Sequence, residues 1–150
     1  MPTARKSGTD PAVAAVEPDA SSIPVLPGED PWTAAELAEV REELVAEVAR
    51  MERAIRIAQA ELEELLREGS DGAGRDPADV GSSNFERDQE MSLAQNAREM
   101  LDQSQLALRL FDEGHYGTCE ACGQPIGKAR LQVFPRATMC VACKQREERR

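Results

Sequence analysis

A long apolar seam in the first half of the chain constrains the fold more than any other feature. Its spacing, alternating steps of three and four residues, is the heptad repeat of a coiled coil. A helix over residues 33–68 would be about 54 Å long at roughly 1.5 Å per residue. A helix of that length does not fit inside a small globule, so it needs a partner helix. The seam consists of Leu37, Val40, Leu44, Val48, Met51, Ile55, Ala58, Leu62 and Leu65.

A capping box predicts where this helix starts, and a glycine-rich segment predicts where it ends. Thr33 and Glu36 have the spacing of a capping box, and Trp32 and Leu37 occupy the two staple positions around it. Residues 69–83, "GSDGAGRDPADVGSS", are rich in glycine and contain a proline, which predicts a turn rather than more helix.

A second helix is predicted after that turn. Ser83 and Glu86 form a second capping box, and Gly114 suits the position just past a helix end, where a positive φ is required. The apolar stripe between them is weaker and is interrupted by Ser104. It consists of Leu93, Ala97, Met100, Leu101, Ala107, Leu108 and Phe111. The prediction is a mainly α fold, with an antiparallel helical hairpin (coiled coil) over residues 31–113 and its tip at 69–83.

The charge of the chain divides at the end of the predicted hairpin. Residues 31–113 carry 20 acidic and 9 basic side chains, whereas residues 114–150 carry 3 acidic and 7 basic ones. The formal net charge of −10 argues against a DNA-wrapping protein, because replacing the counterions of DNA needs positive charge. No sequence-specific DNA binding is expected.

The start of the chain carries no targeting or membrane signal. Residues 1–30 are rich in Pro, Ala, Ser, Asp and Gly without periodicity, which predicts a disordered tail. They contain no apolar core of a secretory signal, and no apolar run in the chain approaches the roughly 18 residues of a membrane span. These observations predict a cytoplasmic protein, in which clustered thiols stay reduced.

All four cysteines lie in two CxxC pairs near the C-terminus, Cys119 with Cys122 and Cys140 with Cys143. The 17-residue spacer falls within the range of four-thiolate zinc sites and has room for a short hairpin. Four thiolates close the coordination shell, which makes one structural Zn²⁺ the predicted cofactor. A redox dithiol or two disulfides are the competing interpretations, but a redox CxxC needs a βαβ setting that is absent here. Residues 114–150 are therefore predicted to form a C4 zinc finger and a short C-terminal helix.

The finger sequence "GHYGTCEACGQPIGKARLQVFPRATMCVACKQ", with "DPADVGSSNFERDQEMSL" before it, resembles the DksA/TraR family of bacterial transcription regulators. The resemblance covers residues 33–148. It implies a non-enzymatic protein that binds RNA polymerase, inserts its hairpin into the secondary channel and alters open-complex stability. The acidic tip motif D-x-x-D of the family matches Asp76 and Asp79. Taken alone, these two residues also fit ordinary turn chemistry.

Two departures from the best-known members refine this resemblance. Gly81 stands where those members have Ala, and the stretch from tip to second helix is longer, as in a subgroup that resembles general stress proteins. Members that respond to guanosine tetraphosphate have Arg before the spacer proline, whereas this chain has Phe134. The implied pocket is incomplete, and alarmone binding is not expected, although Arg130 and Lys144 are retained.

Two further classes of function compete with a channel regulator. A factor that assists transcript cleavage would hold a second Mg²⁺ at an acidic tip, but such factors lack this kind of finger. The basic C-terminal segment alternatively suits a zinc-ribbon nucleic-acid binder, or a stress-related protein-interaction module without a tip mechanism. In either setting Lys128, Arg130 and Lys144 are candidate rim or phosphate contacts. No catalytic set can be assembled, because the chain has one His and its thiols are assigned to metal.

Overall fold

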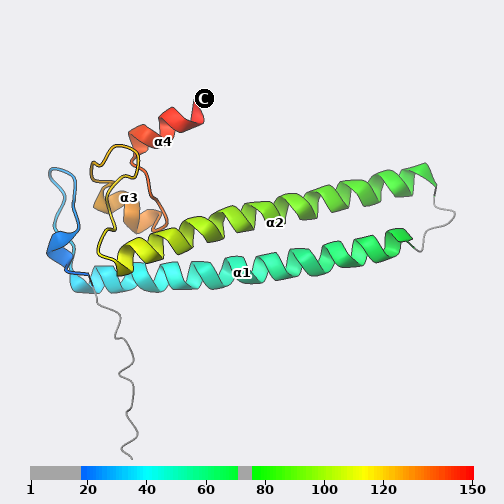
Figure 1. The fold of residues 1–150 in the computed structure, drawn as a ribbon, viewed down its shortest axis with the longest axis horizontal. Coiled ribbons are helices and arrows are strands. Elements are labelled where there is room, and N and C mark those ends of the chain that lie inside the picture. The colour runs from blue at the N-terminus through cyan, green and yellow to red at the C-terminus, as the bar shows by residue number, and fades with distance from the viewer. Residues whose placement is uncertain (1–17, 71–75) are drawn as a thin grey trace, which may run out of the picture.

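The computed structural model describes residues 18–70 and 76–150 of the chain. Two long helices run antiparallel and side by side, and two short helices sit at the end where the first long helix begins and the second ends (Figure 1). The helical hairpin predicted from the heptad seam is confirmed. In chain order the elements are the 3₁₀ turn η1 (Ala20–Ser22), α1 (Ala34–Ser70), α2 (Pro77–Asp112), α3 (Lys128–Val133) and α4 (Val141–Glu148).

The start of α1 is fixed by the predicted capping box. The Thr33 N–H donates to Glu36 Oε2 at 2.9 Å, and the Glu36 N–H donates to Thr33 Oγ1 at 3.2 Å. These two bonds satisfy backbone donors that have no partner within the helix. Trp32 and Leu37, at the staple positions, are both buried in the core.

All nine residues of the predicted seam of α1 are buried or half-buried. On α2 the stripe is confirmed except at Leu93, which is 53% exposed, while the adjacent Ala94 is buried. The seam of α2 therefore runs through small residues, Ala94, Ala97 and Ala107, which lets the helices approach closely. Ser104 is fully buried within it.

The second helix starts earlier than the capping box at Ser83 predicts. It begins at Pro77, with Asp76 as its N-cap, so Ser83 lies inside α2 and that prediction is wrong. Asp76 Oδ1 accepts from the Asp79 N–H at 2.9 Å. An aspartate cap followed by proline at the first helical position is a strong start signal. Of the predicted tip, residues 71–75 lie outside the described part of the chain.

The end of α2 is the predicted glycine stop. Gly114 has a φ of +79°. The His115 N–H donates to the Leu110 carbonyl at 2.8 Å, and the Gly114 N–H donates to the Phe111 carbonyl at 3.2 Å. This pair of bonds is a Schellman motif, and it turns the chain from α2 directly into the cysteine module.

Residues 18–30, which we call the N-terminal strap, are ordered, and the prediction of a disordered tail over 1–30 is wrong for them; residues 1–17 lie outside the described residues. Figure 1 shows the strap, in blue, folded against the cysteine module. Ile23 is buried against Gly117, where an added Cβ would lie 2.9 Å from its Cγ2, and Leu26 lies equally close over Gly127. Both glycines have positive φ, so each position requires a residue without a side chain.

One carboxylate fastens the strap to α3. Glu29 Oε1 accepts from the N–H groups of Leu26 at 2.7 Å and Lys128 at 2.9 Å, and Oε2 accepts from the Ala129 N–H at 2.9 Å. These bonds, led by that from Ala129, lower the pKa of Glu29. They also satisfy two of the orphan donors at the start of α3. The partners lie about 100 positions apart in the chain, which explains why local composition did not reveal this contact.

Replacing Glu29 with Gln is expected to loosen the strap. The amide nitrogen of Gln faces the Ala129 N–H, so that bond is lost, at a cost of about 1 kcal/mol in the free energy of unfolding. Faster hydrogen exchange at the amides of Lys128 and Ala129 would report the change. Because folding lowers the pKa of Glu29, its stabilising effect is present above about pH 4.5 and is lost as the pH falls through the folded-state value. Asp30→Asn is the matched control, and equal exchange in both variants would contradict the assignment.

Candidate metal centre and hairpin tip

The four cysteines converge on one point. Their sulfur atoms all lie within 4.8 Å of one another, and Cys122 Sγ is 3.8 Å from Cys140 Sγ. Four sulfurs bound at about 2.3 Å to one zinc ion stand roughly 3.8 Å apart. All four are free thiols, so the two-disulfide alternative is wrong.

Two different local structures present the two pairs. The first pair sits on a tight turn in which the Gly123 N–H donates to the Cys119 carbonyl at 2.9 Å, and Gly123 has the positive φ, +72°, that such a turn needs. The second pair begins α4, with Cys140 as its N-cap and Cys143 within its first turn. The spacer between the pairs folds into α3 rather than the expected hairpin.

Backbone and side-chain donors prepare the sulfurs for a cation. Burial raises the pKa of the Cys119 thiol, but N–H groups of Cys140, Cys122 and Ala121 donate to its sulfur, and the net pKa is about 6. Arg146 donates to Cys143 Sγ at 3.0 Å. Four thiolates leave a zinc site with excess negative charge, which Arg146 and the backbone donors offset. Sequence reasoning missed this role of Arg146; its position three residues after a ligand on a helix is the signal that points to it.

The donor set fits one structural zinc ion. Every ligand is a thiol, the four sulfurs close a tetrahedral shell, and Cys119 and Cys143 are buried in the same core as the base of the hairpin. In that core Phe111 of α2 lies 5.4 Å from Tyr116, ring to ring. The Tyr116 hydroxyl donates to the Pro135 carbonyl at 2.7 Å. The finger is therefore packed onto the hairpin rather than tethered to it.

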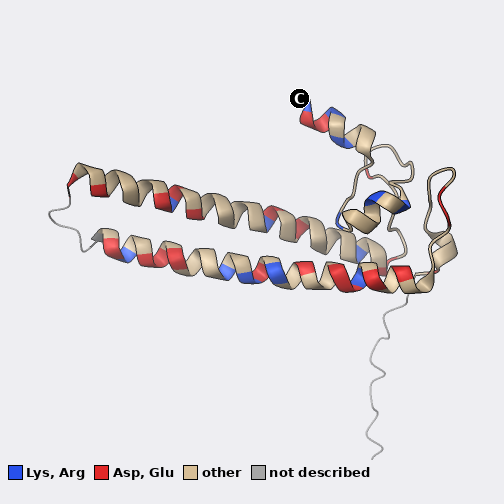
Figure 2. Cartoon of the chain, turned by 180° about the vertical axis from the view of Figure 1, so that it is seen from behind, with Lys and Arg blue, Asp and Glu red and all other residues tan. Residues whose placement is uncertain are grey.

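The candidate tip residues lie at the far end of the molecule. Asp76 and Asp79 are both exposed at the first turn of α2, and Figure 2 shows acidic residues at this end of the helix. One oxygen of the Asp76 carboxylate accepts a hydrogen bond from the Asp79 N–H. Asp76 is therefore both a helix cap and a surface charge. Asp79 makes no side-chain hydrogen bond or ion pair with any other described residue.

Lys128, predicted as a rim or phosphate contact, is engaged within the protein. Its ammonium lies 2.8 Å from Glu36 Oε2 and 3.2 Å from the Pro31 carbonyl oxygen, and 5.6 Å above the Trp32 ring. The residue is only 9% exposed, so this charge joins the finger to the start of α1. The sequence showed a basic residue here but not its half-buried partner, Glu36, 92 positions earlier.

Arg130 and Lys144 are more accessible and share one cleft between α2 and the finger. Arg130 Nε donates to the Met139 carbonyl at 3.2 Å, and its guanidinium lies 5.9 Å from the Phe134 ring. Lys144 pairs with Glu147 at 3.1 Å on the surface of α4. Their role as contacts stays a prediction.

Comparison with known proteins agrees with this architecture. Residues 114–149 match the family model described as the prokaryotic dksA/traR C4-type zinc finger. The RNA polymerase-binding transcription factor DksA of Caulobacter vibrioides is 38% identical over 97 residues, which cover 59% of this chain and 68% of that protein. DksA of Escherichia coli K12 is 28% identical over 135 residues, 89% of this chain and 82% of that one.

The likeness extends to a solved structure. Transcription factor DksA2 from Pseudomonas aeruginosa superposes with a TM-score of 0.61 at 29% identity, over 77% of this chain and 85% of that one. The chain belongs to the DksA/TraR family. The family assignment confirms the four cysteines as a zinc finger. Within residues 18–70 and 76–150, every helix is too short or too polar to span a lipid bilayer.

Removing zinc is expected to unfold the finger and to lower the stability of the hairpin, whose helices nevertheless remain formed. Stripping the ion with a chelator leaves four thiols with no bridging atom, and the finger has little apolar core of its own. Tyr116 should become exposed, which its fluorescence reports, whereas far-UV circular dichroism should retain most of the helical signal of α1 and α2. Elemental analysis should give one zinc per chain before treatment. A finger that stays folded without metal would contradict a structural role for the ion.

Proposed function

We propose that this protein is a transcription regulator that binds RNA polymerase and inserts its hairpin into the secondary channel. The observation that carries the proposal is the separation of two surfaces at the two ends of one long hairpin. Asp76 and Asp79 are exposed at one end of a hairpin whose first helix has 37 residues, and the zinc finger is packed at the other. At roughly 1.5 Å per residue this hairpin reaches about 55 Å. Relatives bear the name RNA polymerase-binding transcription factor.

The charge of the hairpin suits entry into a basic channel. Acidic residues recur along α1 and α2, as Figure 2 shows. Such a surface is attracted to positively charged walls and speeds association, while it repels nucleic-acid phosphates. At the tip, the carboxylates of Asp76 and Asp79 would engage basic side chains or metal-bound water near the active centre, and so alter the stability of open complexes.

The finger supports an action that does not need guanosine tetraphosphate. Phe134 occupies the position before Pro135 and lies beside the Arg130 guanidinium, which is also bound to the Met139 carbonyl. An aromatic ring supplies no charge for a phosphate. We therefore expect the protein to act in the absence of this alarmone.

A nucleic-acid-binding role is less well supported, because several basic residues make contacts within the protein. Of the seven basic side chains in residues 114–150, Lys128 pairs with Glu36, Arg136 pairs with Glu47 and Arg146 contacts Cys143. These contacts place three positive charges against the protein itself. Fewer are left to replace the counterions of a nucleic acid.

The lifetime of open complexes on a ribosomal RNA promoter tests the tip mechanism, with polymerase from the same source. The wild-type protein should shorten the lifetime, and the double variant Asp76→Asn, Asp79→Asn should lose most of this effect while still binding polymerase. Asn is as good a helix cap as Asp, so the substitution removes charge without removing the start of α2.

The double variant Asp88→Asn, Asp102→Asn is the matched control, because it removes the same charge elsewhere on α2. It should act like the wild type. Equal loss in both doubles would show a general charge effect instead of a tip effect. A wild-type protein that binds polymerase without changing the lifetime would leave it as a channel occupant with another role.

A further inference from the structure

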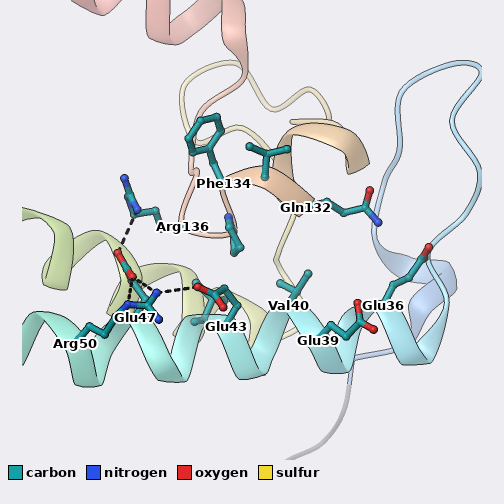
Figure 3. Close-up of a pocket in the computed structure, with 12 residues that line it drawn as sticks. Glu36, Glu39, Val40, Glu43, Glu47, Arg50, Gln132, Phe134 and Arg136 are labelled. Atoms are coloured by element: carbon teal, nitrogen blue, oxygen red, sulfur yellow. Dashed lines mark hydrogen bonds and ion pairs between the residues drawn. The ribbon is translucent and has the colours of Figure 1, made fainter.

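A groove separates the first turns of α1 from the finger, on the side of the hairpin base that α1 forms (Figure 3). It encloses about 580 Å³. One wall is a row of glutamates on α1, and the opposite lip is the end of α3 with the residues after it. The groove is lined chiefly by Glu36, Glu39, Glu43 and Glu47 from α1 and by Val133, Phe134 and Pro135 from the finger. This acidic–apolar groove shares no lining residue with the cleft between α2 and the finger that holds Arg130 and Lys144.

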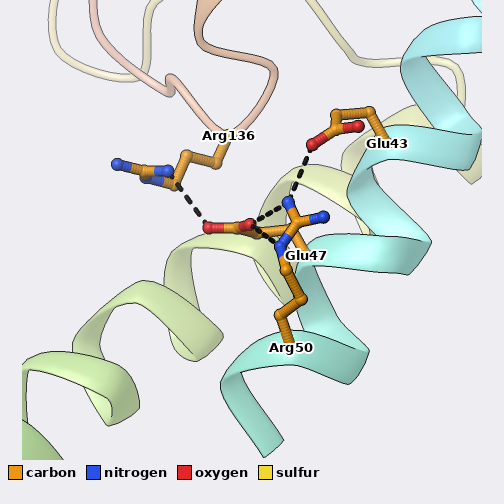
Figure 4. A network of polar contacts seen from close by, with 4 residues as sticks. All are labelled: Glu43, Glu47, Arg50 and Arg136. Atoms are coloured by element: carbon orange, nitrogen blue, oxygen red, sulfur yellow. Dashed lines mark hydrogen bonds and ion pairs between the residues drawn. The ribbon is translucent and has the colours of Figure 1, made fainter. Parts of the chain in front are cut away.

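Two arginines neutralise part of the acidic wall (Figure 4). Arg50 reaches Glu43 at 2.8 Å and also bonds Glu47, while Arg136 from the finger bonds Glu47 at 3.3 Å. Glu47 is thus held between two cations and its side chain is only 12% exposed. This network fixes the floor of the groove.

The part of the α1 wall nearer the start of the helix, at Glu39 and Glu43, keeps negative charge that no cation fully balances. Glu39 makes no side-chain hydrogen bond or ion pair within the described part of the chain. The Glu43 side chain is 54% exposed, and among the described residues it pairs with Arg50. Each of these two carboxylates can accept more hydrogen bonds than the protein supplies.

The opposite lip exposes apolar surface, although the Phe134 ring also lies beside the Arg130 guanidinium. Val133 is 69% exposed and the neighbouring Phe134 is 49% exposed. A valine and a phenylalanine side by side, across a groove from carboxylates, form a surface with one apolar side and one acidic side. Exposed apolar patches with a polar rim are typical of protein–protein contacts.

We propose that this groove docks a basic segment of RNA polymerase, in which Lys or Arg meets Glu39 and Glu43 while an adjacent apolar side chain packs on Val133 and Phe134. The sign of the charge selects the occupant, since the carboxylates repel the phosphates of a nucleic acid or a nucleotide. This inference rests on the proposed polymerase binding. It assigns a second contact at the base of the hairpin, distant from the tip carboxylates.

Binding of fluorescently labelled protein to core polymerase tests the groove. The variant Glu39→Lys, Glu43→Lys should bind about tenfold more weakly than wild type, because it places like charges against the basic segment. The double variant Glu42→Lys, Glu52→Lys changes the net charge equally on exposed positions of α1 outside the groove, and it should bind nearly as wild type does. Added salt should narrow the gap between the two doubles. Zinc content and circular dichroism establish that each variant is folded.

The outcomes separate this inference from the proposed function. If the wild type binds polymerase and both doubles bind equally well, or lose binding equally, the groove proposal is overturned and the proposed function stands. If the wild type does not bind polymerase, the groove proposal and the proposed function are both overturned.

A photo-crosslinker at position 133 gives an independent readout. Val133 projects from the lip and is largely exposed, so p-benzoylphenylalanine is tolerated there. The crosslinked polymerase peptide should contain Lys or Arg beside an apolar residue, and crosslinking should fall in the Glu39→Lys, Glu43→Lys background. A crosslink to an acidic or uncharged segment would contradict the charge complementarity on which the proposal depends.

Discussion

The packing of the zinc finger on the base of the hairpin is the contact on which the rest of the structure depends. The large buried side chains gather at this end, from the strap, both long helices and the finger: Ile23, Trp32, Leu37, Leu44, Phe111, Tyr116, Ile126 and Leu131. Farther along the hairpin the buried residues in the described part of the chain are small, with Ala58, Ala94 and Ala97 among them. The burial of apolar area, and the stabilisation it brings, is therefore concentrated at the base. Two of the cysteines belong to the same cluster, so the metal and the hairpin stabilise one another.

This distribution explains how the protein can present an acidic tip far from its core. The distal half of the hairpin is held by a narrow alanine seam and by the helices' own hydrogen bonds, with little burial to restrain it. It also carries like charges across the helices. Burial, followed by the nearby Glu61, raises the pKa of Glu90, which shows that carboxylates crowd one another there. A hairpin built in this way has low stability at its far end but gains length and negative charge, which are the properties that the proposed insertion into a channel needs.

The sequence predicted features that are encoded locally and missed those that join distant segments. The heptad seam, the capping box at Thr33, the glycine stop at Gly114 and the paired cysteines each depend on neighbouring residues, and each is found as expected. The strap and the buried Lys128 depend on contacts between residues more than 90 positions apart. The prediction of where α2 starts failed for a different reason. Both Ser83 and Asp76 are good caps, and the longer helix, begun at Asp76–Pro77, extends the hairpin by about two turns.

The same comparison shows why counting charges gives only a coarse guide to partners. Lys128 and Arg136 are both basic residues of the finger, yet each holds a glutamate of α1, so the positive charge of the finger is partly used to attach it to the acidic hairpin. Acids without a cationic partner lie along the whole described hairpin, Glu42, Glu52, Asp88 and Asp102 among them. They include the tip residues Asp76 and Asp79 and Glu39 of the groove wall. A charged side chain that is already paired within the protein contributes little to recognition, because it has lost its hydrating water and gained a partner. The residues left over after this pairing, rather than the net charge of the chain, are those from which its contacts with another protein should be sought.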